Sequence, residues 1–352
     1  MKKFYSLACA IFVAALFALV ACGDTSKNNT TKESKLSVVT TIYPEFSWTK
    51  SILGNRADSV KLELLMKNGV DLHSYKPTAH DVAKIASADM VIYVGGESDE
   101  WIKDALAASP KKGRIEINLM KVLGDRVKAE EIVEGMQAEE EHHEHAEAHE
   151  EDEHEHRAEH AEEHEHHHHD EEVENDEHVW LSLKNAEIIV KKIAEELSKL
   201  DAAHATIYKQ NTDAYVAQIQ SLNAEYRETV EKATRKTILF GDRFPFRYLV
   251  DDYSIKYYAA FVGCSAESEA SFETIAFLAG KMDEESLPVI FTIENSNGTI
   301  AKAVLAASKK SQNAQILILN SMQSVTEKQI AEGIDYLSLM KSNLDVLKKA
   351  LN

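Results

Sequence analysis

The sequence predicts an α/β protein in which two parallel-sheet lobes are joined by a long, rigid backbone helix. Short apolar runs alternate with segments of helical periodicity in both halves of the chain, a pattern typical of parallel strands connected by helices. Between the halves, residues 203–233 keep helical periodicity without a glycine or a proline. About 320 residues follow the N-terminal segment, which is too many for one core and enough for two lobes.

The first 35 residues predict export and a lipid anchor. A short basic start precedes the apolar run Leu7–Val20, which is too short for a comfortable transmembrane helix and is typical of a signal peptide. The run ends in LVAC, which resembles the bacterial lipoprotein signal, in which the cysteine becomes the lipidated N-terminus. A plain cleaved signal with a chance cysteine is the alternative. We therefore expect residues 1–22 to be the signal, with lipid on Cys22, and residues 23–35 to be a polar tether.

The first lobe contains four predicted strands separated by helices and loops. The strands are Leu36–Thr41, Val60–Leu65, Met90–Val94 and Arg114–Asn118. The helices are Pro44–Leu53, Asp81–Ser87 after the capping residue Thr78, and Glu100–Ala107. Ligands of such folds gather in loops at the carboxyl ends of the strands. The loop that follows the second strand carries His73, which is therefore a candidate ligand.

Residues 139–177 form a run of acids and histidines. Twelve of the 16 histidines lie between His142 and His169, and the run carries 20 acidic residues and one basic residue. The run therefore has a charge of −19, and the whole chain has a net charge of −20. The acidity of the chain thus belongs to this run and not to the folded lobes. The run has almost no apolar side chains to bury, so we expect it to be disordered. So many imidazoles among carboxylates favour contact with a divalent metal, zinc best among the abundant ones, over a merely solubilising acidic loop.

Two helical segments follow the histidine-rich run, at Leu183–Leu200 and Ala203–Ala233. About 30 residues of helix span roughly 45 Å, which is comparable to the diameter of a domain. The second segment could pack within a bundle. Its position between two α/β halves favours a strut that joins the lobes.

The second lobe repeats the alternation of strands and helices. The predicted strands are Lys236–Phe240, Lys256–Phe261, Pro288–Thr292 and Ala314–Leu319. The predicted helices are Phe244–Asp252, Ser271–Lys281, Gly298–Ser308 and Gly333–Leu351. The lobes are thus expected at residues 36–202, including the histidine-rich run, and at residues 235–352, with the linking helix at 203–234.

The chain has three cysteines, and only one is expected to remain a free thiol. Cys9 leaves with the signal and Cys22 would carry lipid, which leaves Cys264. A single thiol cannot form an intramolecular disulfide, so the exported protein must be stabilised by its core. Cys264 is either a soft metal ligand or, as is more usual for a lone cysteine, a small buried residue.

The sequence contains no motif that indicates catalysis. It has no glycine-rich phosphate loop, no Gly-x-Ser-x-Gly elbow and no HExxH pair. A zinc hydrolase would need an open coordination position and a general base, and no motif supplies the base. We therefore expect no enzymatic activity.

Several motifs occur in a specific order along nearly all of the mature chain. The first half has VTTIYP at 39–44, GVDLHSYKPT at 69–78 followed by Asp81, and Ala88-Asp89 leading to VGGE at 94–97. The second half has EHVWL at 177–181 and DYLSLM at 335–340, followed by Asn343-Leu344. This series resembles the zinc/manganese-binding lipoproteins of bacterial ABC importers. The zinc branch of that family also carries a histidine-rich loop between its first two ligand motifs or just before the second, as here.

The resemblance implies one metal between the two lobes, held by two histidines of the first lobe and two ligands of the second. His73 and His178 match the two histidine positions. A core or surface histidine is the usual alternative. Their placement in matching motifs favours the ligand role.

The second lobe departs from the family pattern at both ligand positions. Gly241 stands where relatives carry His or Glu, and Asp242 comes next. Asn320 stands where relatives carry Asp. The resemblance therefore implies Asp242 and Asn320 as the remaining ligands, with helix capping or turn formation as their alternative role. Glu294 and Glu100 are the other candidate ligands.

The function implied by the resemblance is capture of Zn²⁺ outside the cytoplasm and its delivery to an ABC permease in the inner or cytoplasmic membrane. Two imidazoles with oxygen ligands favour zinc, whereas Mn²⁺, the alternative substrate, would prefer more carboxylate. The expected location is the extracytoplasmic face of the cell membrane, with an anchor through lipid on Cys22. A surface adhesion or metal-buffering protein that uses the histidine-rich run is the alternative class. We expect a monomer and no nucleic-acid partner.

Overall fold

The computed structural model describes residues 35–137, 174–265 and 269–352. The predicted signal and tether, with Cys22, lie outside the described residues, as does the histidine-rich run up to residue 173. No helix in the part of the chain that the structure describes is both long and apolar enough to cross a membrane.

The first sheet has four parallel strands in the order β2-β1-β3-β4. They are β1 (Ser37–Thr40), β2 (Lys61–Leu64), β3 (Met90–Tyr93) and β4 (Ile115–Asn118). All four were predicted, each one or two residues longer than observed.

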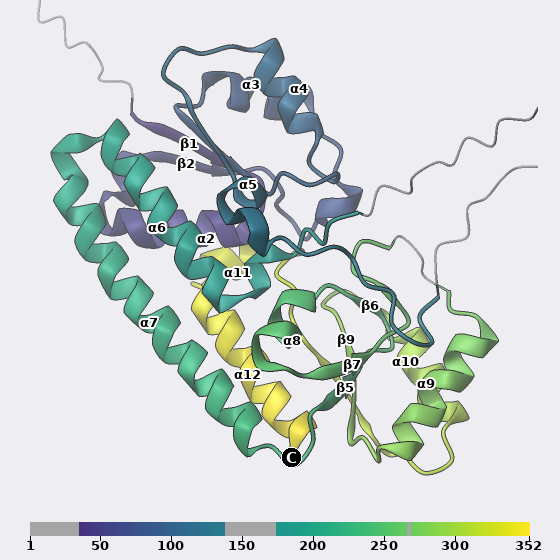
Figure 1. Ribbon diagram of the computed structural model, residues 1–352. Helices are drawn as coiled ribbons and strands as arrows, with labels where there is room; N and C mark the ends of the chain where they lie inside the picture. Colours follow the sequence, from purple (N-terminus) through teal and green to yellow (C-terminus); the bar gives the residue numbers. More distant parts are fainter. Residues whose placement is uncertain (1–34, 138–173, 266–268) are drawn as a thin grey trace, which may run out of the picture. The chain divides into compact units, whose positions relative to one another are not determined.

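Helices cover both faces of the first sheet, and alternate residues of each strand point to opposite faces. Val38 and Ile92 pack into the large core with α2 (Tyr43–Leu53) and α6 (Leu183–Leu200). Val39 and Val91 point the other way and pack with α3 (Ala79–Ser87) and α4 (Trp101–Ala108). Figure 1 shows these two helix layers on either side of the strands.

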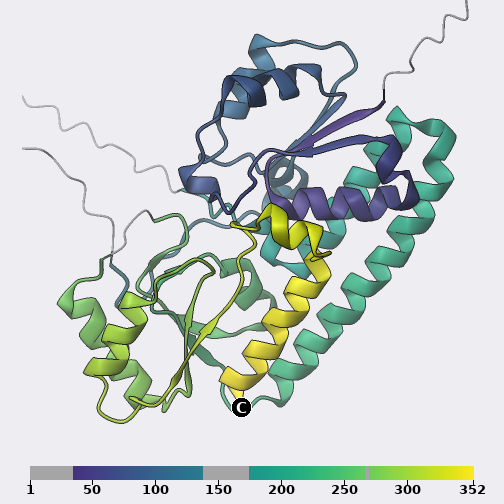
Figure 2. The ribbon, with the colours of Figure 1, turned by 180° about the vertical axis from the view of Figure 1, so that it is seen from behind.

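The helix α7 (Ala205–Lys232) runs past both sheets (Figures 1 and 2). Its 28 residues correspond to about 42 Å of helix. Asn211 donates to the carbonyl of Ile52 in α2 (2.9 Å), and the Tyr226 hydroxyl donates to that of Met340 in α12 (Tyr336–Leu351; 2.6 Å). The long helix predicted at 203–233 is therefore confirmed, and it contacts helices from both halves of the chain.

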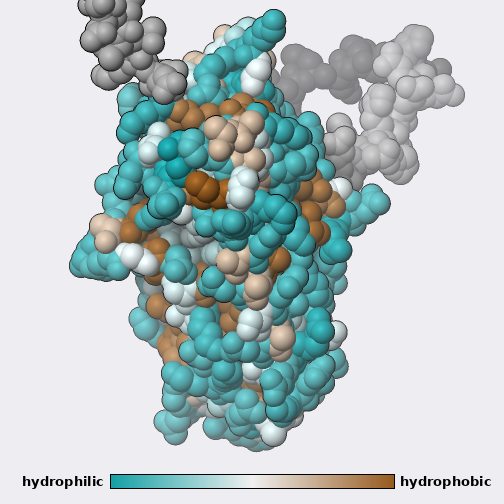
Figure 3. Space-filling view, turned by 90° about the vertical axis from the view of Figure 1, so that its left-hand side faces the viewer, coloured by the Kyte–Doolittle hydropathy of each residue, from teal (hydrophilic) through white to brown (hydrophobic). Residues whose placement is uncertain are grey.

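One side of α7 is buried, as its periodicity predicts. Its buried apolar residues are Tyr208, Tyr215, Val216, Ile219, Leu222, Tyr226 and Val230. Its other side is polar and exposed, and the face of the molecule on the α6–α7 side is largely hydrophilic (Figure 3). The helix is therefore amphipathic, and its packing depends on the shared core.

The second sheet is also parallel. It consists of the pairs β10-β9 and β5-β7, which are joined by a bridge between Phe240 and Phe291. The strands are β5 (Thr237–Leu239), β7 (Lys256–Tyr258), β9 (Val289–Thr292) and β10 (Gln315–Ile318). The outer face packs on α9 (Phe272–Glu284) and α10 (Thr299–Ala307), while the other face joins the large core.

The structure differs from the prediction at three places in the second half. The segment predicted to begin a helix at Phe244 starts instead as strand β6 (Arg243–Phe244), and the helix α8 covers Arg247–Tyr253. β6 pairs with β8 (Phe261–Val262), whose first residue was predicted as the end of the strand that begins at Lys256. A short helix, α11 (Glu327–Ala331), was not predicted.

Residues Leu36–Asn352 form one compact unit, and one hydrophobic core extends from β1 to α12. The boundaries predicted at 202/203 and 234/235 remain predictions. What matters for function is that the carboxyl ends of β2, β9 and β10 all lead into loops that carry the candidate ligands.

Candidate metal centre

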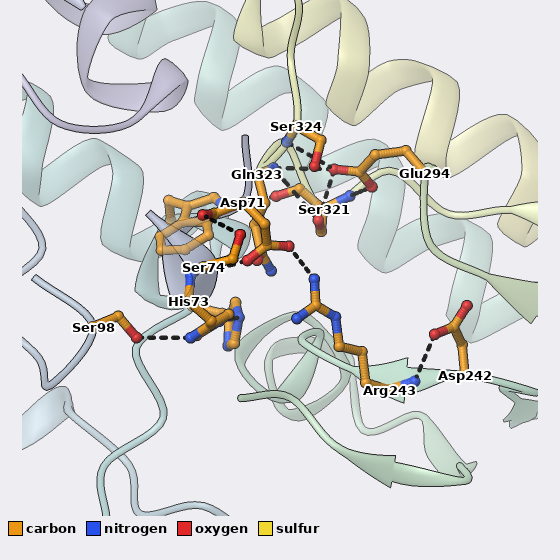
Figure 4. Close-up of polar contacts among 12 residues, drawn as sticks. Asp71, His73, Ser74, Ser98, Asp242, Arg243, Glu294, Ser321, Gln323 and Ser324 are labelled. Carbon is orange, nitrogen blue, oxygen red and sulfur yellow. Dashed lines mark hydrogen bonds and ion pairs between the residues drawn. The ribbon is translucent and has the colours of Figure 1, made fainter. Parts of the chain in front are cut away.

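His73 lies in the loop after β2, on a single 3-10 turn (Leu72–Ser74). The Asp71 carboxylate caps this turn by accepting from the backbone N–H of His73 (3.0 Å). Nδ1 of His73 lies 2.7 Å from the Ser98 hydroxyl. Because its backbone and Nδ1 are both held, His73 presents Nε2 for further contacts (Figure 4).

His178 is fully buried and is held by Asp176. One carboxylate oxygen of Asp176 accepts from the backbone N–H of His178 (2.8 Å) and from its ring Nδ1 (3.0 Å). A carboxylate can only accept, so Nδ1 carries a hydrogen and Nε2 is the ring nitrogen left for other contacts. The following turn is fixed by Trp180, whose indole donates to the carbonyl of Ser321 (2.8 Å).

The two histidines meet at their Nε2 atoms, 3.1 Å apart, although 105 positions separate them in the chain. Burial, together with the nearby His178 and the charge of Arg243, lowers the pKa of His73 to about 2. His73 is therefore a neutral imidazole at physiological pH. A neutral imidazole is the form that binds a metal ion.

Cys264 lies beside this histidine pair. One ligand atom each from His73, His178 and Cys264 lies within 4.8 Å of the other two. The cysteine follows β8 in a turn, and its backbone N–H donates to the carboxylate of Glu130 (3.2 Å). Burial raises the pKa of the Cys264 thiol well above its ordinary value, and the negative charge of Glu130 raises it further. The thiol is therefore protonated when no metal is bound.

Asp242 lines the same cavity as His73, which has a volume of about 410 Å³. Figure 4 shows its carboxylate directed away from His73, with the side chain of Arg243 between them. One oxygen, Oδ1, accepts from the N–H of Arg243 (2.9 Å). The other, Oδ2, is buried and has no hydrogen-bond partner among the described residues. The guanidinium of Arg243 forms an ion pair with Asp71.

The other predicted candidates make local contacts. The side-chain oxygen of Asn320 accepts from the N–H of Met322 (2.9 Å), which is a turn contact. Glu294 accepts from Ser321 and from the loop that follows it. Glu100 forms an exposed ion pair with Lys103 (3.1 Å). The structure thus brings His73 and His178 together, and places Asp242 in the cavity wall and Asn320 in a turn.

The sequence matches the family described as zinc-uptake complex component A, periplasmic, over residues 38–350. The chain belongs to this family. It is 30% identical to the high-affinity zinc uptake system protein ZnuA of Bacillus subtilis (strain 168) over 342 residues, with 96% of each chain covered. It is 31% identical to the zinc-binding lipoprotein AdcA of Streptococcus pneumoniae (strain ATCC BAA-255 / R6) over 349 residues, or 99% of this chain. It spans only 61% of the length of AdcA.

Solved structures of the ZnuA family show the same fold. The Zn(II)-bound ZnuA-like domain of Streptococcus pneumoniae AdcA is 27% identical, with a TM-score of 0.64, covering 90% of this chain and 99% of that chain. The metal-dependent lipoprotein YcdH from Bacillus subtilis is 26% identical, with a TM-score of 0.66 and the same coverage. The predicted fold class and the resemblance stated from the motifs are both confirmed.

Gln323 contacts His178 in this ZnuA-family chain, and it was not among the residues predicted from the sequence. When its amide nitrogen donates to both oxygens of Asp71 (3.0 and 2.9 Å), its amide oxygen lies 2.9 Å from Nε2 of His178. Its position in the loop at the carboxyl end of β10 was the available signal, because ligands gather at that edge. A neutral amide did not stand out from its neighbours in the loop.

Proposed function

We propose that this protein is the extracytoplasmic receptor of an ABC importer and that it captures Zn²⁺ at His73 and His178. The observation that carries the proposal is the 3.1 Å contact between the two Nε2 atoms. Two nitrogens bound to one tetrahedral zinc at about 2.0–2.1 Å lie about 3.3 Å apart. The pair is therefore close to the spacing that a zinc ion requires.

The chemistry of the pair supports zinc over manganese. Imidazole nitrogen suits zinc, whereas manganese prefers carboxylate and water oxygen. The carboxylate of Asp176 holds His178 from its far nitrogen, as is typical of metal-bound histidines. The ZnuA relative is a zinc uptake protein and the AdcA relative is a zinc-binding lipoprotein, which supports the same substrate.

Asp242 and Asn320 remain the predicted ligands from the second lobe. The buried Oδ2 of Asp242, which has no partner among the described residues, is available to a metal after rotation of the side chain. Asn320 would have to release the N–H of Met322. A second lobe that moves toward the histidines on binding and away on delivery suits a receptor that must release its metal.

Delivery to a membrane permease and anchoring through Cys22 are part of the same proposal. The family description names a periplasmic component of a zinc-uptake complex, and AdcA is named a lipoprotein. Substitution Cys22→Ser should abolish the incorporation of labelled fatty acid and release the protein from membranes. If the variant still incorporates the label and stays membrane-bound, the anchor does not form at Cys22. We propose no enzymatic activity, because the family is one of uptake components.

The test of the proposed function compares His73→Ala and His178→Ala with His80→Ala, a matched change at an exposed histidine on α3. Competition titration with a zinc chelator should show loss of one tight zinc equivalent in the first two variants and no change in the third. In cells that lack their own zinc receptor, only the parent and His80→Ala should restore zinc uptake. Retention of the tight equivalent in both site variants would refute the site. Failure of the parent to restore uptake would favour an adhesion or metal-buffering role.

A further inference from the structure

Within the described ranges, one group of three or more histidine, cysteine, aspartate or glutamate side chains is placed to hold a single metal ion: His73, His178 and Cys264. No carboxylate belongs to it. We propose that the thiolate of Cys264 is the third zinc ligand and that it makes the receptor selective for zinc over manganese. This inference rests on the proposed function, and it gives the ligand position predicted for Asp242 to Cys264, a residue that the family pattern does not supply.

The distances fit a zinc ion without rearrangement of the backbone. Around a tetrahedral zinc, a nitrogen at about 2.0–2.1 Å and a sulfur at about 2.3 Å lie about 3.6 Å apart. The ligand atoms of the three residues already lie within 4.8 Å of one another, and the two nitrogens are 3.1 Å apart. Changes of about one ångström, within the range of side-chain rotation, close the site.

The chain around Cys264 is arranged for close approach to His178. Strand β8 is held against β6 by the pairs Arg243–Phe261 and Phe244–Val262. At Gly263, the next residue, a Cβ would lie 2.9 Å from the carbonyl oxygen of Phe244 and 3.0 Å from Cε1 of His178. A side chain there would force the turn away from the imidazole. The glycine therefore permits the contact between the turn of Cys264 and the histidine pair.

The charge of the site also favours a thiolate. Imidazole binds zinc in its neutral form and supplies no charge, so with His73 and His178 alone the two positive charges of zinc would be uncompensated. When zinc binds, the S–H bond of Cys264 breaks, the sulfur lone pair bonds to the metal and the proton leaves to solvent. The bound site then carries one net positive charge.

A thiolate ligand changes which metals the receptor accepts. Soft sulfur favours zinc, and it suits manganese poorly, because manganese prefers oxygen ligands. If Asp242 were the third ligand instead, its carboxylate would bind manganese better relative to zinc than the thiolate of Cys264 does. The identity of the third ligand therefore determines the selectivity of uptake.

The experiment uses Co²⁺ as the probe, because cobalt replaces zinc in tetrahedral sites and a sulfur–cobalt bond gives an intense charge-transfer band in the near ultraviolet. The full chain carrying Cys9→Ser and Cys22→Ser has Cys264 as its single thiol, since the sequence contains three cysteines. The histidine-rich run contains no sulfur and cannot produce the band. We expect the band to grow to one equivalent of Co²⁺ and to disappear when Zn²⁺ is added.

The matched variants are Cys264→Ser and Asp242→Ala, each in that background. Cys264→Ser should lose the band and bind zinc more than about a hundredfold more weakly. Removing a residue that only supports a metal ligand typically lowers metal affinity 10- to 100-fold, and removing a ligand itself should lower it more. Asp242→Ala should keep the band. The preference for zinc over manganese should fall in Cys264→Ser, measured by competition between the two metals.

Two results separate the failure of this inference from the failure of the proposed function. If the parent binds one Co²⁺ tightly without the charge-transfer band, Cys264 is not a ligand, and the histidine site stands. If the parent binds no metal tightly, the receptor function itself is wrong. Because the band is read on the parent, the test does not depend on the folding of any variant at position 264.

Discussion

Asp176 orients the ring of His178 through one carboxylate oxygen. Removing this carboxylate tests how strongly the orientation of the imidazole affects zinc affinity. The backbone of Asp176 is held independently of its side chain. Its N–H donates to the backbone carbonyl of Lys128 (2.8 Å), and its own carbonyl accepts from the Tyr248 hydroxyl (2.8 Å). Asp176→Ala should therefore leave the loop in place and free the imidazole to rotate. We expect zinc affinity to fall about 10- to 100-fold, as for other carboxylates that support a metal-bound histidine.

Chelator competition measures this effect, with two comparison variants. Asp176→Asn keeps an oxygen that can accept from Nδ1, so it should bind zinc more tightly than Asp176→Ala. Asp213→Ala removes an exposed carboxylate on α7 that pairs with Lys209 and should have no effect. Equal affinities for Asp176→Ala and the parent would show that His178 is held without its carboxylate partner.

The candidate site could be predicted only in part from the sequence, and the reason lies at the level of single residues. His73 and His178 were predicted because each lies in a motif of its own, and their motifs survive as local structure. Cys264 was left open between a ligand and a core residue, because nothing local shows that its turn approaches His178. That approach depends on the pairing of β8 with β6 and on the space at Gly263.

At the level of elements, the position of the loop Ser321–Ser324 after β10 depends on one acidic residue in the segment that follows the neighbouring strand, β9. The carboxylate of Glu294, which follows β9, accepts from the N–H of Ser321 (2.6 Å), from the hydroxyl of Ser321 (2.8 Å) and from the N–H of Gln323 (3.0 Å). The same loop carries the Gln323 side chain toward His178 and Asp71. Glu294 therefore holds in place the part of the second lobe that faces the histidine pair.

Glu294→Ala should destabilise the protein by about 2–3 kcal/mol, because several partly buried donors lose a charged acceptor at once. Unfolding in urea measures the loss. The control is Glu327→Ala, which removes a carboxylate from an exposed ion pair with Lys67 and should cost less than about 1 kcal/mol. If both variants lose the same small amount, the loop does not depend on Glu294 for its position.

Strands that lie inside the sheets were predicted well, and short elements at their edges were not. The apolar runs of β1, β3, β5 and β9 are buried on both faces, which is the pattern that identifies a strand of a covered parallel sheet. β6 is only two residues long, and it exists because Phe244 pairs with the distant Val262. Its local sequence carries no alternation to reveal this, and so Phe244 was included in the predicted helix.

At the scale of the whole molecule, the histidine-rich run and the ordered site should be separable. The ends of the run are held by the folded body: the backbone N–H of Gln137 donates to the carbonyl of Ala260 (2.9 Å), and that of Glu130 donates to the carbonyl of Glu174 (2.8 Å). A deletion should therefore retain Gln137 and Glu174 and replace residues 139–173 with a Gly-Ser linker. We expect this variant to lose several weak zinc equivalents and to keep one tight equivalent.

Isothermal calorimetry with Zn²⁺ distinguishes these two classes of site. The deletion leaves His178 and its partner Asp176 unchanged, so any loss of the tight equivalent would mean that the run itself supplies the binding site. A second copy of the deletion that also carries His178→Ala serves as the control and should show no tight binding. A tight equivalent in that control would place the site outside the histidine pair.

Zinc should also stabilise the folded protein, because the site joins segments that are far apart in the chain and exists only in the native state. A ligand that binds only the native state adds about 2.7 kcal/mol when its free concentration is a hundredfold above its Kd. In a protein of this size, that should raise the Tm by about 4–5 °C. The histidine-rich run would obscure the effect, because it is expected to bind zinc weakly in the unfolded chain as well, and such binding opposes stabilisation.

The measurement is therefore best made on the variant that lacks residues 139–173, by scanning calorimetry with and without Zn²⁺ after removal of bound metal with a chelator. Its Tm should rise with zinc concentration. The same deletion carrying His73→Ala and His178→Ala should show no rise, since it lacks both nitrogens that meet at 3.1 Å. An equal rise in both proteins would show that zinc stabilises the fold from somewhere other than the histidine pair. A rise that is larger in the full chain would show that the run binds zinc more strongly in the native state than in the unfolded one.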